Sequence, residues 1–351
     1  MKDIFEWLPD VNQEYNNTFG SQTLVGPASA FSKSAGTFFT MAAHEETLLI
    51  KPDPATAPHI GIIDWPNQET NGGMTTFNIE FGRFEIDYPE GVLWIGGRDS
   101  RRETEINIRS VFSVKCRELI FFGDLNDAIR PVTTLNVVND GIFDVAGGSV
   151  SFNGDINLND NGAILTKTDS LAFTSPSINL FGNSKILMDI DSDIIDVDAT
   201  GTTAFILHDS SYLKITATAI SEDTTSKLGI LVMTKGNSSA EVYIDEYRGP
   251  MTYVLEEGSS TITVSSRNNP ANPFLYSPGT GERKPKASFN FVTADGLNNG
   301  TIVLKGLENN VFQRTWLAEN KIILIDNVFA DEADFNFEQR GSDLYISLAR
   351  K

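Results

Sequence analysis

The sequence predicts an all-β protein: a right-handed parallel β-helix with three short strands in each coil of about 22 residues, followed by a small C-terminal β-domain or cap. The first observation is the scarcity of helical signals, because no window keeps apolar residues at i, i+3, i+4 and i+7 over three turns. The second is a series of short alternating segments between residues 132 and 197, each closed by Gly, Asn, Asp or Ser, which recur about every 7.4 residues. The third is apolar identity three segments apart, in the pairs Ile156 and Ile178, Leu158 and Leu180, and Ile164 and Ile186.

This repeat separates two all-β folds. The strands of an antiparallel sandwich usually recur about every 8–12 residues. In a solenoid each inward side chain stacks on its counterpart one coil later, so its apolar identity persists at the length of a coil. A sandwich has no reason to keep that repeat, and the parallel β-helix therefore fits better.

The flanking segments differ from this centre. We expect residues 1–50 to form an N-terminal cap or attachment region, because an uncovered solenoid end exposes a strand edge. Residues 51–265 are assigned to the β-helix. Residues 266–287 contain four prolines and little periodicity, which indicates a loop or linker. Alternating segments return in residues 288–351, the predicted C-terminal β-domain or cap.

One run carries a resemblance to a known family. Residues 147–165, Gly-Gly-Ser-Val-Ser-Phe-Asn-Gly-Asp-Ile-Asn-Leu-Asn-Asp-Asn-Gly-Ala-Ile-Leu, resemble the passenger repeats of bacterial autotransporter adhesins. Related patterns occur in phage fibre and tailspike solenoids, and the resemblance covers about residues 132–265. It implies a location that is secreted, on a cell surface or on a virion, and a role in adhesion or recognition.

The chain departs from an autotransporter in two respects. Its start has no apolar run of the secretory type, and no long membrane barrel follows the repeats. No stretch approaches the roughly 18 apolar residues of a membrane helix, so we expect no membrane span. A passenger fragment, a virion protein and a stand-alone solenoid all remain open.

Charge and cysteine content exclude several classes of protein. Lys and Arg number 27 against 47 Asp and Glu, a net charge of −20, and nucleic-acid binding requires a basic face. The single cysteine, Cys116, excludes an intrachain disulfide framework. It shares its position in the alternation with Phe112 and Val114, which predicts a buried, inert thiol.

A rod with repeated outer faces suits display more than chemistry. We therefore expect a non-catalytic solenoid that binds a carbohydrate or protein ligand, or that self-associates, as a monomer or trimer. The alternative is a polysaccharide-degrading β-helix, a glycoside hydrolase or lyase with paired carboxylates. A further alternative is a structural subunit of a larger particle. No residue is assigned a catalytic role.

Two places are candidate ligand sites. In the alternating run 241–247, Val242 and Ile244 are expected to point inward, which places Tyr243, Asp245 and Tyr247 on the outer face. Aromatic rings beside carboxylates stack on sugars, whereas ordinary cross-strand packing is the alternative explanation. Arg283 and Lys284 form a basic group in the proline-rich loop, either as a partner contact or as a solvated surface.

The densest acidic segment is the candidate metal site. Asp189, Asp191 and Asp193 begin a run of five Asp within ten residues, and carboxylate oxygens are the ligands that Ca²⁺ prefers. The run lacks the glycine of an EF-hand loop. Outward Asp residues that solvate one face of a coil are the alternative. Apart from this calcium, we expect no cofactor.

Overall fold

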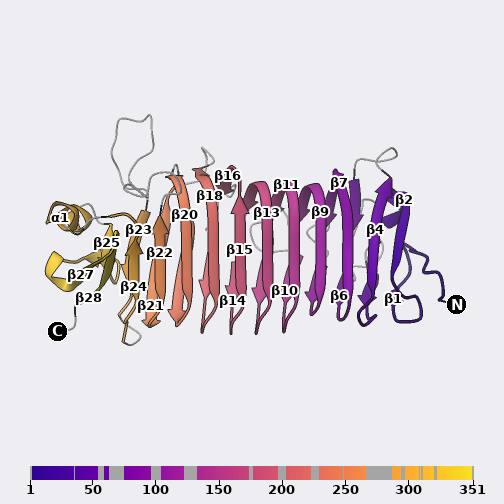
Figure 1. Ribbon diagram of the computed structural model, residues 1–351, viewed down its shortest axis with the longest axis horizontal. Helices are drawn as coiled ribbons and strands as arrows, with labels where there is room; N and C mark the ends of the chain where they lie inside the picture. The colour runs from indigo at the N-terminus through magenta and orange to yellow at the C-terminus, as the bar shows by residue number, and fades with distance from the viewer. Residues whose placement is uncertain are drawn as a thin grey trace. The chain divides into compact units, whose positions relative to one another are not determined.

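A computed structural model of the chain describes most of its 351 residues. The described ranges are 2–34, 36–53, 59–62, 75–95, 104–121, 133–173, 177–196, 203–222, 229–247, 249–265, 287–293, 297–307, 309, 311–319 and 322–349. The chain forms two compact units, Met1–Pro176 and Ser177–Lys351. In each unit the strands lie side by side in two sheets, one of shorter and one of longer strands (Figure 1).

The first unit pairs all its strands in parallel. Its short-strand sheet consists, in spatial order, of β1 (Gln13–Tyr15), β3 (Phe38–Met41), β6 (Thr75–Ile79), β8 (Thr104–Ile108), β10 (Thr133–Val137) and β12 (Asp155–Leu158). Its long-strand sheet consists of β2 (Gln22–Pro27), β4 (Thr47–Asp53), β7 (Arg83–Ile95), β9 (Val111–Phe121), β11 (Ile142–Phe152) and β13 (Ala163–Phe173), with β5 (His59–Ile62) beside β7 and the 3-10 helix η1 (Ala28–Phe31) after β2.

The second unit repeats this arrangement and then reverses direction. Its short-strand sheet consists of β14 (Ser177–Leu180), β17 (Ala204–Leu207), β19 (Ile230–Gly236), β21 (Met251–Gly258), β23 (Ala287–Phe291), β25 (Ile323–Ile325) and β26 (Val328–Phe329). Its long-strand sheet consists of β15 (Lys185–Ile190), β18 (Tyr212–Glu222), β20 (Ser239–Tyr247), β22 (Thr261–Ser265), β24 (Thr301–Leu304), β28 (Asp343–Leu348) and β27 (Phe335–Arg340), with β16 (Asp193–Asp196) beside β18. The 3-10 helix η2 (Glu332–Asp334) precedes β27, and α1 (Val311–Glu319) is the one α-helix of the described residues.

The last strands of the second unit close both of its sheets. β24 still pairs in parallel with β22, but β28 is antiparallel to β24, and β27 is antiparallel to β28. β26 likewise turns back on β25. Such reversals are one way to end a solenoid, because they stop the regular addition of parallel coils. Within the described part of the chain, no helix is long and apolar enough to cross a membrane.

Each long strand contains a bend that inverts the alternation of its side chains. In β9 the buried residues are Phe112, Val114 and Cys116, followed by Leu119 and Phe121, so the inward positions change from even to odd numbers. In the second unit the same bend separates β15 from β16, and both of these strands pair with β18. A coil therefore has three straight segments, which agrees with the expected segments of about seven residues.

The length of a coil is not constant. Partners one coil apart are 21 residues apart at Leu135 and Ile156, close to the expected 22. They are 29 residues apart at Phe77 and Ile106. The additional residues fall between strands, so they lengthen the connection and leave the pairing register intact. The repeating pairs expected from the sequence each join a residue of one unit to a residue of the other, and they stay predictions.

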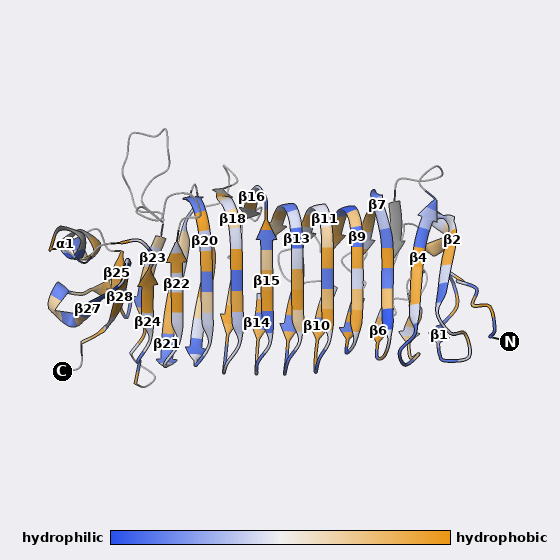
Figure 2. Cartoon of the chain, in the orientation of Figure 1, coloured by the Kyte–Doolittle hydropathy of each residue, from blue (hydrophilic) through white to orange (hydrophobic). Residues whose placement is uncertain are grey.

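Apolar side chains fill the space between the sheets of each unit, as the alternating orange and blue along the strands shows (Figure 2). Rings stack on the rings of the neighbouring coil in the first unit. Phe84 and Phe112 have centroids 5.2 Å apart, and Phe112 and Phe143 have centroids 5.3 Å apart. A second stack joins Phe121 to Phe152, at 5.0 Å. Such contacts arise because parallel pairing places the same position of successive coils in register.

An outward ladder of asparagines follows the short-strand sheet of the first unit. Each side-chain amide donates to the amide oxygen of the preceding coil, from Asn107 to Asn78 (3.0 Å), from Asn136 to Asn107 (2.9 Å) and from Asn157 to Asn136 (3.1 Å). Identical amides satisfy one another only when the coils stack in register. The ladder therefore fixes the register of four strands, β6, β8, β10 and β12.

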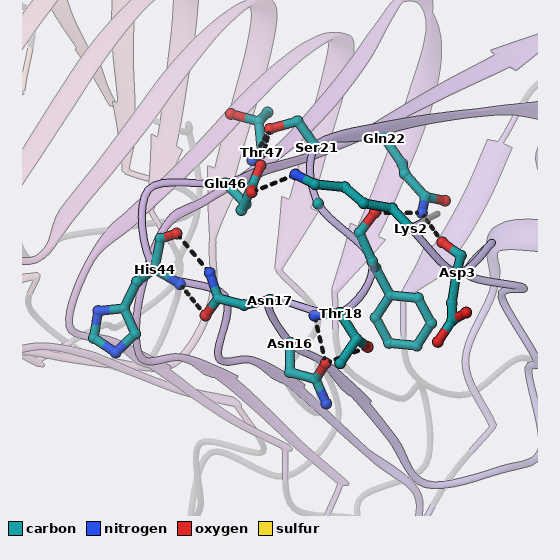
Figure 3. A network of polar contacts seen from close by, with 12 residues as sticks. Lys2, Asp3, Asn16, Asn17, Thr18, Ser21, Gln22, His44, Glu46 and Thr47 are labelled. Atoms are coloured by element: carbon teal, nitrogen blue, oxygen red, sulfur yellow. Dashed lines mark hydrogen bonds and ion pairs between the residues drawn. The ribbon is translucent and has the colours of Figure 1, made fainter.

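The amino-terminal residues cover the first coil. β1 and β2 already pair with β3 and β4, and the expected boundary at residue 50 falls inside β4. The strap formed by residues 2–12 bends over these strands, and polar contacts hold it in place (Figure 3). Lys2 forms an ion pair with Glu46 at 2.8 Å, and the Gln22 side chain accepts from the Phe5 N–H and donates to the Asp3 carbonyl.

Below the strap, an aromatic plug closes the interior. Trp7 lies with its ring centroid 4.9 Å from that of Phe39 and stacks on Phe84 at 6.1 Å. Phe5 makes an edge contact with Tyr15 at 5.0 Å. All five rings are buried, so the strap shields the end of the core from water.

The thiol of Cys116 is buried, as the sequence predicts. Burial, with a smaller contribution from the Glu118 carboxylate, raises the pKa of this thiol to about 12. Because the thiolate is the reactive species, we expect no reaction with a thiol reagent at neutral pH in the native state and full reaction in guanidinium. Absorbance with Ellman's reagent measures both, and rapid labelling of the native chain would contradict the inward position.

Candidate functional site

The candidate site lies on the outer face of the long-strand sheet of the second unit. There β18, β20, β22, β24, β28 and β27 are neighbours in that order. Their registers align outward side chains in rows across the strands. One row joins Lys214, Glu241 and Thr263, and the next joins Thr216, Tyr243 and Ser265.

Two lysines flank the ring of Tyr243. The ammonium of Lys214, on β18, lies 5.6 Å from the ring centroid, and that of Lys305, which follows β24, lies 5.8 Å from it. The strand order brings these lysines to Tyr243 from opposite sides. Neither forms an ion pair with a residue that the structure describes, so both ammonium groups retain hydrogen-bonding capacity.

Glu241 orients this aromatic group. Its carboxylate accepts a hydrogen bond of 2.7 Å from the Tyr243 hydroxyl. Burial raises the pKa of Tyr212 to about 12, with the Glu241 charge adding to the effect, and the same two causes hold the pKa of Tyr243 well above its usual range. Both phenols therefore stay protonated at neutral pH and act as neutral donors beside one carboxylate.

A small cavity of about 200 Å³ lies further along the same face. A row of three hydroxyls and an amide lines one side of it, in the register Thr261, Thr301, Ser347 and Asn336. Val303, which is buried, provides an apolar patch. The remaining lining side chains are Tyr345, Glu338 and Arg340.

Arg340 holds two neighbours at the rim of this cavity. Its guanidinium lies 4.5 Å from the Tyr345 ring centroid and forms an ion pair of 2.7 Å with Glu338. The hydrogen bond from Arg340 lowers the pKa of the Glu338 carboxyl, which is therefore ionised at neutral pH. The cavity thus combines hydroxyls, one amide and an ion pair whose charges offset each other.

The structure places the sequence-predicted ligand residues differently from one another. Tyr243 and Asp245 lie on the outer face and are half-buried. The outward position expected for Tyr247 is wrong, because its ring is buried and its hydroxyl lies 3.2 Å from that of Tyr253. The bend at Asp245 and Glu246 inverts the alternation in β20, as it does in β9. Arg283 and Lys284 lie outside the described residues.

The candidate calcium residues occupy the bend between β15 and β16. Asp189 is exposed near the end of β15, Asp191 is exposed in the bend, and Asp193 begins β16. Among the side chains that the structure describes, no three His, Cys, Asp or Glu residues gather in a group able to hold a metal ion. Calcium binding stays a prediction.

Sequence reasoning missed the two lysines and the whole cavity. These residues come from strands separated by long connections, such as the 40 residues between the partners Thr261 and Thr301. The only local signal is an outward polar residue at alternate positions, for example Tyr345 between the buried Leu344 and Ile346. Such a pattern places a residue on a face but does not say which strand lies beside it.

Comparisons with known proteins give no relative for this chain. No protein-family model matches it, and the searches of curated proteins and of solved structures each found no match. Its own strand pairing therefore defines its class, an all-β chain of long, mostly parallel sheets that is compatible with a β-helix or solenoid.

Proposed function

We propose that the chain is a non-catalytic, right-handed parallel β-helix that binds carbohydrate on the outer face of its second unit and acts in adhesion or recognition at a cell surface or on a virion. The observation that carries the proposal is the half-buried Tyr243 ring between the ammonium groups of Lys214 and Lys305. Parallel strands joined by crossovers are right-handed in about 98% of cases, which supports the proposed hand.

The chemistry of this cluster suits a sugar. One face of a pyranose presents C–H groups that pack on an aromatic ring, while its hydroxyls require both donors and acceptors. Lys214 and Lys305 supply donors, and Glu241 supplies an acceptor. A ring with a few fixed polar groups around it is the usual composition of a small-molecule site.

Binding is favoured over catalysis by the state of the carboxylate at the nearby cavity. A glycosidase needs a general acid whose pKa is raised, so that it carries a proton at neutral pH. The pKa of Glu338 is shifted the opposite way by its bond to Arg340. Polysaccharide cleavage is therefore the second outcome to test.

A glycan array probed with the purified chain, with and without Ca²⁺, tests the proposal, and release of reducing ends is monitored for each glycan that binds. We expect binding without cleavage, and we expect Tyr243→Ala to weaken it roughly tenfold or more, since truncating a stacking ring removes a binding hot spot. Phe81→Ala is the matched control, because it removes an exposed ring of the first unit and is expected to leave binding unchanged.

Three results would contradict the proposal. They are a blank array, cleavage of a bound glycan, and equal binding by the parent chain and Tyr243→Ala. A blank array together with concentration-dependent sedimentation would favour self-association or a structural role. Binding that requires Ca²⁺ would direct attention to Asp189, Asp191 and Asp193.

A further inference from the structure

We propose that the cavity between β22, β24, β28 and β27 binds one neutral sugar ring, the terminal residue of the glycan, so that the chain is recognised from its end. This inference rests on the proposed function where it concerns a longer glycan. The binding of a single ring stands on the cavity alone.

The cavity contains hydroxyls that have no partner in the protein. The side chains of Thr261, Thr301 and Ser347, and the hydroxyl of Tyr345, form no hydrogen bond with any residue in the described ranges. A hydroxyl both donates and accepts, so a row of them matches another row of hydroxyls better than it matches a charged group. The edge of a pyranose presents such a row.

The size of the cavity admits a single ring. Its volume of about 200 Å³ is below the ~300–1,000 Å³ of sites for drug-sized ligands. Val303 offers an apolar surface for the C–H groups of the ring, and Arg340 fixes the Tyr345 ring as a wall. An oligosaccharide therefore places one residue inside and its other residues outside.

The charges at the cavity favour a neutral ring. The two charged lining groups, Glu338 and Arg340, form an ion pair with each other. An additional anion or cation would have to compete with this pair, whereas a polyol leaves it in place. This differs from the surroundings of Tyr243, where two ammonium groups lack an anionic partner among the described residues.

The spacing between the two places indicates how a longer glycan lies. The strand order from Tyr243 to the cavity is β20, β22, β24 and β28. Three strand spacings of about 4.8 Å correspond to about 14 Å, which is longer than one sugar ring. A glycan with its terminal residue in the cavity thus carries its inner residues towards Tyr243.

Ligand-observed NMR with free glucose, galactose, mannose and N-acetylglucosamine tests the cavity directly. We expect saturation transfer to at least one of these sugars, and we expect Thr301→Val to weaken its binding about tenfold or more, because the isosteric change removes only a hydroxyl. Tyr243→Ala is expected to leave this signal unchanged. Thr252→Val, a half-buried outward threonine of β21 in the other sheet, is the matched control, and thermal unfolding verifies that each variant is folded.

The possible results separate this inference from the proposed function. The inference is overturned if none of the four sugars binds or if Thr301→Val binds as well as the parent chain. For a glycan that binds on the array, trimming its terminal residue should remove the effect of Thr301→Val and retain that of Tyr243→Ala. If Tyr243→Ala weakens binding while Thr301→Val does not, the proposed function stands and recognition of the chain end fails. If a free sugar binds in the cavity and the array is blank, the cavity stands and the proposed function fails.

Discussion

Replacing Phe112 with alanine is expected to destabilise the chain by about 3–5 kcal/mol, the usual cost of truncating a fully buried phenylalanine. Its ring is 1% exposed and lies in the middle of a stack, between Phe84 and Phe143. The neighbouring coils are fixed by their backbone pairing, so they cannot collapse into the resulting cavity. The shift of the urea unfolding midpoint measures the loss.

Ser113→Ala is the matched control for this variant. Ser113 lies next to Phe112 on β9 but points outward and is half-buried, so its loss is expected to change stability by less than about 0.5 kcal/mol. If Phe112→Ala cost under about 1 kcal/mol, the stacked rings would not be a packed core.

Lys33 is the second residue whose replacement is expected to have a large effect. It is 1% exposed, and its ammonium donates to the carbonyls of Leu8 and Val11 and to the side chain of Gln13, at 2.7–2.8 Å. Lys33→Met keeps the length of the side chain but leaves three acceptors without a donor. We therefore expect a loss of about 2–3 kcal/mol, measured by urea unfolding, whereas Lys51→Met on the surface should change little.

The same lysine makes stability depend on pH. Burial lowers the pKa of Lys33 from its ordinary 10.5 to about 8, although the Asp10 carboxylate opposes the shift. Between these two values the unfolded chain binds more protons than the folded chain, so stability rises with pH and is lost as pH falls through this window. The urea midpoint of the parent chain is expected to rise from about pH 8 to about pH 9.5, and the midpoint of Lys33→Met is not expected to show this component.

The opposite sign applies at higher pH. Burial, with the Glu46 charge adding, raises the pKa of Tyr15 to about 12, so the unfolded chain releases this proton first and stability falls above the ordinary tyrosine range. The Lys33 measurement therefore ends below that range. A midpoint that rises equally in both chains would show that another group causes the effect.

The sequence predicted the strands more reliably than their neighbours. Alternation identified the inward residues of β9 and the short segments of each coil, because side chains of a strand point alternately to opposite faces. It failed at the bends, where two successive residues face the same way, and this is why Tyr247 was assigned to the wrong face. It also could not give a constant coil length, since the connections between strands vary without changing the register.

The candidate site shows the same division. Tyr243 and Asp245 were found because an aromatic residue and a carboxylate alternate within one strand. Lys214 and Lys305 were missed because they lie on other strands, 29 residues before and 62 residues after Tyr243 in the sequence. Their approach to one ring depends on pairing between coils, which no local pattern contains.

The asparagine ladder has a consequence for how such a chain can change in length. Because each amide bonds to its equivalent in the adjacent coil, a duplication or loss of one entire repeat, such as the 21 residues from Asn136 to Asn157, restores the same bonds. A change of any other size inside a strand displaces the amides and the core together. Evolution can thus lengthen or shorten this scaffold in discrete steps, while connections between strands accept insertions of any size.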